Sequence, residues 1–116
     1  MVRTEEIVRV AHDAHRAWQS VTGDPASSPR WDEAPGRQRV SAIDGVRHAQ
    51  SGATAEQLHD GWCDFEAADG WQYGPMTNEI ARTHPCLVPY AELAPDQHRM
   101  DDLFQAVVTA LSNQEA

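Results

Sequence analysis

The feature that most constrains the fold of this chain is an internal repeat, in which a helical segment is followed by a loop and by a helix that starts at proline. Residues 11–18 (AHDAHRAW) parallel residues 58–65 (LHDGWCDF), and residues 34–40 (APGRQRV) parallel residues 94–100 (APDQHRM). The interval from the shared histidine to the shared proline is 23 residues in the first half and 36 in the second. The repeat predicts a mainly α-helical domain of two pseudo-two-fold related helix-loop-helix halves, with an insertion in the second.

Apolar spacing and helix-start residues predict four helices. They run from Thr4 to about Val21, from Pro35 through Arg47, from a Thr54-x-x-Gln57 capping box to near Gly70, and from Pro95 onward. The last has the clearest helical period, because apolar residues recur every three or four positions between residues 100 and 111. Each half therefore contributes two helices to the predicted fold.

Residues 71–94 interrupt the helical pattern. Gly74, Pro75, Pro85 and Pro89 are incompatible with a long helix across this segment. Residues 71–73 and 87–88 are predicted as two short strands, which would form the small β element of the fold.

Length and composition favour one small globular domain. The 116 residues, 41% of them hydrophobic, suffice for a single core. No apolar run approaches the roughly 20 residues that span a bilayer, so we expect a cytoplasmic protein that does not enter a membrane. Cys63 and Cys86 lie in no metal-binding or redox spacing and are expected to be buried free thiols.

The charge is strongly asymmetric. The net charge is −9, and residues 51–116 hold two Arg against eleven Asp and Glu, whereas residues 1–50 are balanced. A nucleic-acid partner is not expected, because phosphate attraction requires a basic surface. The acidic second half suits a basic protein partner or a small ligand instead.

The chain lacks the motifs of the common catalytic and metal sites, including G-x-S-x-G, the P-loop and H-E-x-x-H. His12 and His15, or His12 and His59, have no third ligand at a diagnostic spacing. The pair Asp101 and Asp102 is interpreted as an ordinary solvated helix surface. We therefore predict no catalytic residue, no metal and no cofactor, and a protein that is not an enzyme.

Candidate ligand-binding residues concentrate in the second half. If the segment around Trp71 and Tyr73 is extended, their rings point to opposite faces, and one ring could stack on a planar base or both could pack on the helices. Arg82 and Arg99 could clamp an anion or pair on the surface with Asp101, Asp102 or Glu79. Trp62 suits a core position, and His84, before a proline, suits a turn cap or a ligand contact. The candidate set is Trp62, Trp71, Tyr73, Arg82, His84, Tyr90 and Arg99.

Residues 70–75 (GWQYGP) and 84–90 (HPCLVPY), with His59-x-x-Trp62 before them and the Pro95 helix after them, resemble the ryanodine receptor repeat (RyR) domain from about residue 54 to 112. The first half is similar to the small, stand-alone RyR proteins of bacteria and phages, through residues 12–13, 23–24, 31–35 and 41–46. The resemblance implies one RyR-like domain over residues 1–116, with residues 1–50 as a degenerate half-repeat and 51–116 as a full repeat.

This resemblance implies a non-enzymatic binding module for a small nucleotide-derived ligand, an adenine nucleotide or an ADP-ribose-like signal. Such a module would act as a sensor or as a sequestering, anti-defence protein, in the host cytoplasm if it is phage-encoded. The alternative is a protein-interaction domain that forms a homodimer or higher homo-oligomer without a small ligand. Relatives tend to carry lysine where this chain has Glu66 and Thr77, and often asparagine where it has His15. If those lysines contact a phosphate in relatives, this chain lacks the contact.

Overall fold

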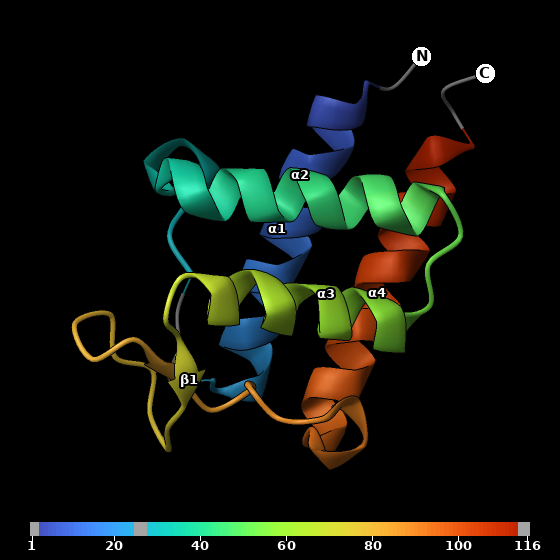
Figure 1. The fold of residues 1–116 in the computed structure, drawn as a ribbon. Coiled ribbons are helices and arrows are strands. Elements are labelled where there is room, and N and C mark those ends of the chain that lie inside the picture. Colours follow the sequence, from blue (N-terminus) through green and yellow to red (C-terminus); the bar gives the residue numbers. More distant parts are fainter. Residues whose placement is uncertain (1–2, 25–27, 114–116) are drawn as a thin grey trace.

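The computed structural model describes residues 3–24 and 28–113, and this part of the chain folds into four α-helices in two crossed layers (Figure 1). The elements are, in chain order, α1 (Thr4–Thr22), the 3-10 helix η1 (Trp31–Glu33), α2 (Gly36–Gln50), α3 (Ala55–Ala68), β1 (Gln72–Tyr73), β2 (Thr83–His84), the 3-10 helix η2 (Tyr90–Glu92) and α4 (Pro95–Ser112). In Figure 1, α2 and α3 lie in front of α1 and α4 and cross them. The predicted class, mainly helical with a small β element, is confirmed.

Local signals determine where the helices of the second half begin. The hydroxyl oxygen of Thr54 accepts a hydrogen bond from the Gln57 backbone N–H at 3.2 Å, and the Gln57 side chain accepts one from the Thr54 backbone N–H at 2.9 Å. This reciprocal capping box satisfies two N–H groups that the first turn of a helix leaves unpaired. Pro95 occupies the first turn of α4, where the missing N–H costs nothing.

The hydrophobic core lies between α1, α2 and α4. Its buried residues are Ile7, Val8, Ala11, Trp31, Val46 and Val108. No described residue of α3 belongs to this cluster, and the two buried side chains of α3 are the polar His59 and Glu66. The apolar face of α3 is therefore available to line a space rather than to fill the core.

The two halves repeat a contact as well as an order of elements. In the first half, Nε2 of His12 donates to the Pro29 carbonyl oxygen at 2.6 Å, and its ring centroid lies 5.5 Å from that of the tryptophan that begins η1. In the second half, Nε2 of His59 donates to the Val88 carbonyl oxygen at 2.7 Å, and its ring centroid lies 6.0 Å from that of the tyrosine that begins η2. Each histidine thus connects the first helix of its half to the segment that leads into the second.

The additional residues of the second half form a small two-stranded parallel sheet, in which Gln72 pairs with Thr83 and Tyr73 with His84. The prediction of a strand at residues 71–73 is confirmed at Gln72–Tyr73, but the prediction at 87–88 is wrong. Pro85 has no N–H to continue β2, and the backbone N–H of residue 87 instead donates to the His84 carbonyl oxygen, which closes a turn.

Glycine at position 74 permits this sheet. A Cβ at Gly74 would lie 2.5 Å from the Cβ of Thr83, so any other residue would push the two segments apart. None of the described helices has the length and apolar character needed to cross a lipid bilayer.

Candidate functional site

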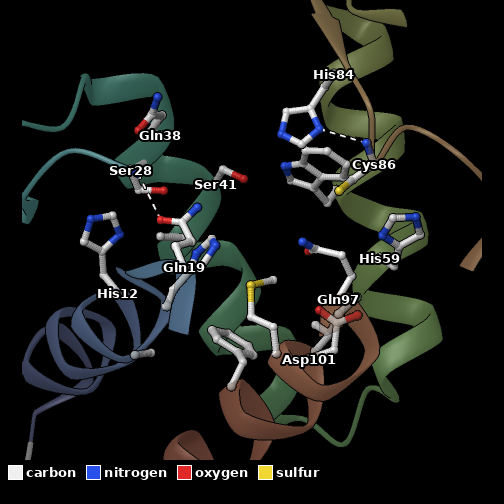
Figure 2. Close-up of a pocket in the computed structure, with 18 of the residues that line it drawn as sticks. His12, Gln19, Ser28, Gln38, Ser41, His59, His84, Cys86, Gln97 and Asp101 are labelled. Atoms are coloured by element: carbon white, nitrogen blue, oxygen red, sulfur yellow. Dashed lines mark hydrogen bonds between the residues drawn. The ribbon is translucent and has the colours of Figure 1, made fainter. Parts of the chain in front are cut away.

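A cavity of about 440 Å³ lies between the two halves and is lined by residues of all four α-helices (Figure 2). Its floor is apolar and includes Val8, Val46, Met100 and Phe104. Its rim is polar. The cavity thus lies at the junction of the two halves.

The first-half wall carries amide and hydroxyl groups from α1, α2 and the segment between them. Gln19 is 7% exposed, and its side-chain oxygen accepts a hydrogen bond from the Ser28 backbone N–H at 3.0 Å. This bond fixes the amide, and Figure 2 shows its nitrogen on the side of Ser41. Gln38 and Ser41 of α2 line the same wall. The wall therefore offers both donors and acceptors to an uncharged polar ligand.

The second-half wall combines Trp62 of α3 with His84 and Cys86, which belong to the inserted segment between α3 and α4, residues 71–94. Nδ1 of His84 accepts a hydrogen bond from the Cys86 backbone N–H at 3.0 Å, so the ring caps the turn after β2. The Trp62 and His84 rings meet edge to face with centroids 5.0 Å apart. Burial lowers the pKa of His84, and the neutral ring that accepts at Nδ1 carries its proton on Nε2, which faces the cavity in Figure 2. His84 thus acts both as a turn cap and as a donor on this wall.

Asp101 of α4 lies on the same side as His59 (Figure 2) and is not part of a solvated surface, so the interpretation of Asp101 and Asp102 as a solvated pair is wrong for Asp101. Within the described chain, Oδ2 of Asp101 is the one buried side-chain oxygen or nitrogen without a hydrogen-bond partner. Burial raises the pKa of Asp101 to about 6, although His59 and His98 act in the opposite direction. At neutral pH the cavity therefore contains an ionised acceptor with an unused oxygen.

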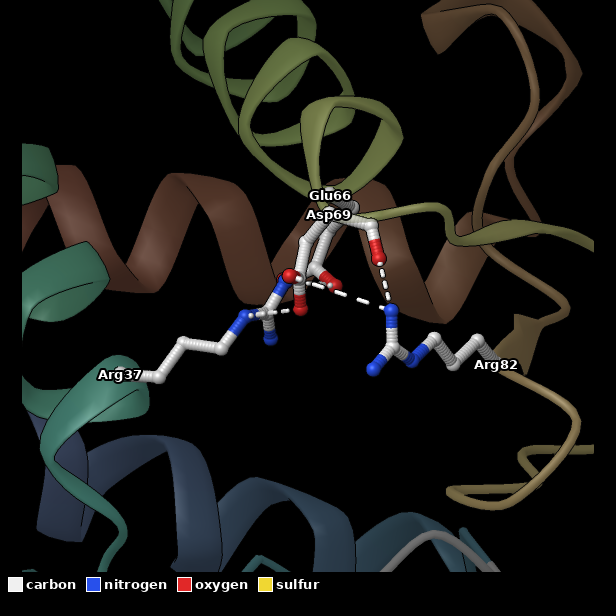
Figure 3. Close-up of polar contacts among 4 residues, drawn as sticks. All are labelled: Arg37, Glu66, Asp69 and Arg82. Atoms are coloured by element: carbon white, nitrogen blue, oxygen red, sulfur yellow. Dashed lines mark hydrogen bonds and ion pairs between the residues drawn. The ribbon is translucent and has the colours of Figure 1, made fainter.

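The charges that line the cavity are mostly negative. Arg37 is the one arginine or lysine among its described lining residues, while Asp24, Glu66, Glu79 and Asp101 supply carboxylates. Arg37 itself is engaged by two of the carboxylates at the end of α3: its guanidinium contacts Glu66 and Asp69, each at 2.9 Å (Figure 3). This pairing leaves the cavity with excess negative charge.

The structure brings three of the seven candidate ligand-binding residues to the cavity, namely Trp62, Trp71 and His84. Trp71 also borders a second, more open pocket on the outside of α3, where it meets Tyr73, which is 59% exposed. Tyr90 lies against His98, with ring centroids 4.4 Å apart, and does not line the cavity. Of the aromatic candidates, Trp71 thus borders both pockets, Tyr73 borders only the outer one, and Tyr90 borders neither.

The two arginine candidates, Arg82 and Arg99, also lie outside the cavity lining, and their partners differ from those expected. Arg82 donates to the Asp69 backbone carbonyl oxygen at 2.7 Å, at the end of α3, where a cation is favoured by the helix dipole (Figure 3). Arg99 lies 3.7 Å from Asp96, one turn earlier on α4. The expected surface pairs with Asp101, Asp102 or Glu79 are therefore replaced by contacts to Asp69 and Asp96.

Sequence reasoning missed the polar residues of α4 that face the cavity, Gln97 and Asp101. A signal for them exists, because both positions share the helical face of Phe104 and Val108, at the spacing i, i+4, i+7 and i+11. Polar residues on the apolar face of a helix indicate a buried polar surface. Arg37 and Gln19 were missed as well, since nothing near them in sequence indicates their partners.

His15 gives a prediction for the pH dependence of stability. Burial, and secondarily the nearby His12, lower its pKa from 6.5 to about 4, whereas Asp24 acts in the opposite direction. Below pH 6.5 the unfolded chain binds a proton at this position that the folded chain does not, so stability falls as pH falls from 6.5 toward 4. The free energy of unfolding should therefore decrease less on acidification in His15→Asn than in the wild type. We expect a difference of about 2 kcal/mol between about pH 7.5 and about pH 4.5, measured by urea unfolding.

The matched control is His48→Asn, since His48 is an exposed histidine on α2. Its unfolding free energy should follow the wild-type pH dependence. Parallel curves for His15→Asn and the wild type would contradict the prediction.

In a comparison with known protein families, residues 45–112 match the RyR domain. The matched region runs from the middle of α2 to the end of α4 and covers more than half of the chain. It includes the insertion and the second-half wall of the cavity. The first-half wall, with Gln19 and Gln38, comes from residues before the match.

Proposed function

The chain belongs to the RyR domain family, and from this premise we propose that it is a non-enzymatic module that binds a small nucleotide-derived ligand, an adenine nucleotide or an ADP-ribose-like signal, in the cavity between its halves. In this proposal the domain acts as a sensor or as a sequestering protein, in the cytoplasm of a host cell if it is phage-encoded.

The observation that carries the proposal is the cavity itself. Its volume of about 440 Å³ lies within the range of roughly 300–1,000 Å³ typical of small-molecule sites. The Trp62 side chain on one wall provides an aromatic surface for a planar base. The amide and hydroxyl groups of the opposite wall suit the hydroxyl groups of a ribose.

The chemistry of the cavity supports binding rather than covalent catalysis. Burial raises the pKa of the Cys86 thiol to about 11, so this cysteine stays protonated and weakly nucleophilic at neutral pH. The nearest imidazole, that of His84, holds the Cys86 backbone N–H rather than its sulfur. Neither group is arranged as an activated nucleophile.

The proposal is tested by calorimetric titration with adenosine, ATP, ADP-ribose and cyclic ADP-ribose. At least one should bind, and Trp62→Ala should weaken that ligand about tenfold or more, because stacking of a base on an aromatic ring contributes roughly 1–3 kcal/mol. The readout is the dissociation constant, with circular dichroism to verify the fold of each variant.

Tyr73→Ala is the matched control, because Tyr73 is an aromatic residue of the same half of the chain that lines the outer pocket and not the cavity. It should leave affinity unchanged. If none of the four ligands binds the folded protein at millimolar concentration, the proposed function is wrong. If Tyr73→Ala abolishes binding and Trp62→Ala does not, the ligand lies outside the cavity.

A second candidate function is homo-oligomerisation. The observation that favours it is the exposure of two large apolar side chains on the insertion, Met76 at 75% and Ile80 at 97%. A monomeric mass in light scattering would remove this candidate, and a concentration-dependent dimer would support it.

A further inference from the structure

We propose that the cavity accepts the uncharged nucleoside part of its ligand and excludes phosphate groups, with Asp101 as the residue that selects for hydrogen-bond donors. This inference rests on the proposed function and narrows the ligand class. The ligand is a nucleoside, or a nucleotide whose phosphates remain outside the cavity.

Among the described lining residues, the one arginine or lysine already has its charge balanced by carboxylates. Arg37 already contacts Glu66 and Asp69, each at 2.9 Å, and its guanidinium lies 4.9 Å from the Phe65 ring centroid and 5.6 Å from that of Trp71. Its position is thus determined by two carboxylates and two rings. A phosphate would therefore meet a guanidinium whose charge two carboxylates already balance.

The histidines of the cavity do not supply the missing charge. Burial lowers the pKa of His15 to about 4 and also lowers that of His84, so both are neutral at pH 7.5. His12 and His59 each use Nε2 to hold a backbone carbonyl oxygen of their own half. His15 and His84 thus present neutral rings to a phosphate, and the Nε2–H groups of His12 and His59 are already engaged.

The carboxylates that line the cavity also repel a phosphate group. Besides Glu66, the lining includes the carboxylates of Asp24, Glu79 and Asp101, from three different segments of the chain. In a partly desolvated cavity, like charges several ångströms apart repel each other more strongly than they do in bulk water. A dianionic or more highly charged ligand would meet this repulsion from several sides.

Asp101 favours ligands that carry hydrogen-bond donors. Its buried Oδ2 has no hydrogen-bond partner, and such an atom is costly unless a donor reaches it. A nucleoside carries suitable donors in its amino and ribose hydroxyl groups. The Gln19 and Ser41 side chains on the opposite wall supply groups for its remaining polar atoms (Figure 2).

The first test uses the unmodified protein and three probes that share one nucleoside and differ in the number of phosphate groups: adenosine, AMP and ATP. In calorimetry at pH 7.5 and low salt, affinity should decrease from adenosine to AMP to ATP, and adenosine should bind at least about tenfold more tightly than ATP. Added salt should reduce the ratio of the adenosine affinity to the ATP affinity, because it screens the repulsion between the phosphates and the carboxylates. Equal or tighter binding of ATP would overturn the inference and leave the proposed function intact.

The second test exchanges one oxygen for nitrogen at Asp101. Asp101→Asn should weaken adenosine about tenfold through loss of a charged acceptor, and should weaken ATP less, because loss of repulsion offsets the lost contact. The ratio of the two affinities should therefore fall, which a variant that merely disturbs the fold would not produce. Asp102→Asn removes the same charge from the adjacent, exposed position and should leave the ratio unchanged.

The outcomes separate the two proposals. Equal weakening of adenosine and ATP by Asp101→Asn would overturn the selecting role of Asp101. Absence of binding by adenosine, AMP and ATP, together with ADP-ribose and cyclic ADP-ribose, would overturn the proposed function and this inference with it.

Discussion

Replacement of Arg37 by alanine is expected to lower the free energy of unfolding by about 3 kcal/mol. Arg37 extends from α2 to the end of α3, where its partner Glu66 has a side chain only 9% exposed. Removal of the guanidinium would leave the Glu66 carboxylate buried without its ion-pair partner, which is the most costly way to break such a pair. Because no described residue of α3 joins the hydrophobic core, polar contacts of this kind contribute much of its attachment.

The measurement is urea unfolding of Arg37→Ala, Glu66→Gln and the double variant. The double variant should lose less than the sum of the single losses, because each single change also removes the partner's interaction. Arg9→Ala is the matched control: Arg9 pairs with Asp32 at 2.7 Å, but both side chains are about half exposed or more. The control should cost about 0.5 kcal/mol or less. A similar loss in Arg37→Ala and Arg9→Ala would contradict the prediction.

Replacement of Ile7 by alanine is expected to cost about 3 kcal/mol, by removal of buried methyl groups and creation of a void. Ile7 is 0% exposed and lies in the core cluster of α1, α2 and α4. Ile7 itself does not line the cavity, so the change tests the core without removing a cavity side chain.

Val10→Ala serves as the control, because Val10 is an aliphatic residue on the same helix but is 46% exposed. It should change the unfolding free energy by about 0.5 kcal/mol or less, since alanine favours the helix and little apolar surface is lost. The two variants are compared by the urea concentration at the midpoint of unfolding, with the slope of the unfolding free energy against urea concentration unchanged. Equal effects of the two substitutions would show that Ile7 is not part of a close-packed core.

Much of the fold follows from local sequence. The capping box at Thr54 and the proline that begins α4 define helix starts through contacts within one turn, so the sequence predicts them without knowledge of the tertiary structure. The strand at Thr83–His84 was missed, because its partner is Gln72–Tyr73 and the pairing depends on the turn between them. In that turn the Asn78 side chain accepts from two backbone N–H groups, a contact that apolar periodicity does not reveal.

The candidate site was predicted less completely than the fold. The residues that line the cavity among the seven candidates, Trp62, Trp71 and His84, stand out as aromatic or heteroaromatic residues in the family motifs. Arg82 stands out in the same way as a rare cation, yet it caps α3. Its role depends on how the insertion folds back on the helix end.

The sequence by itself determined the four helices, the repeated order of elements and membership of the RyR domain family, because capping, periodicity and motif order are properties of short segments. The tertiary structure decided that the halves enclose a cavity, that Asp101 faces it and that Glu66 holds the one arginine of its described lining. Those features depend on side chains from helices far apart in sequence. The distances between these side chains are fixed only when the helices pack. The same packing decides which charged groups line the cavity and would contact a ligand.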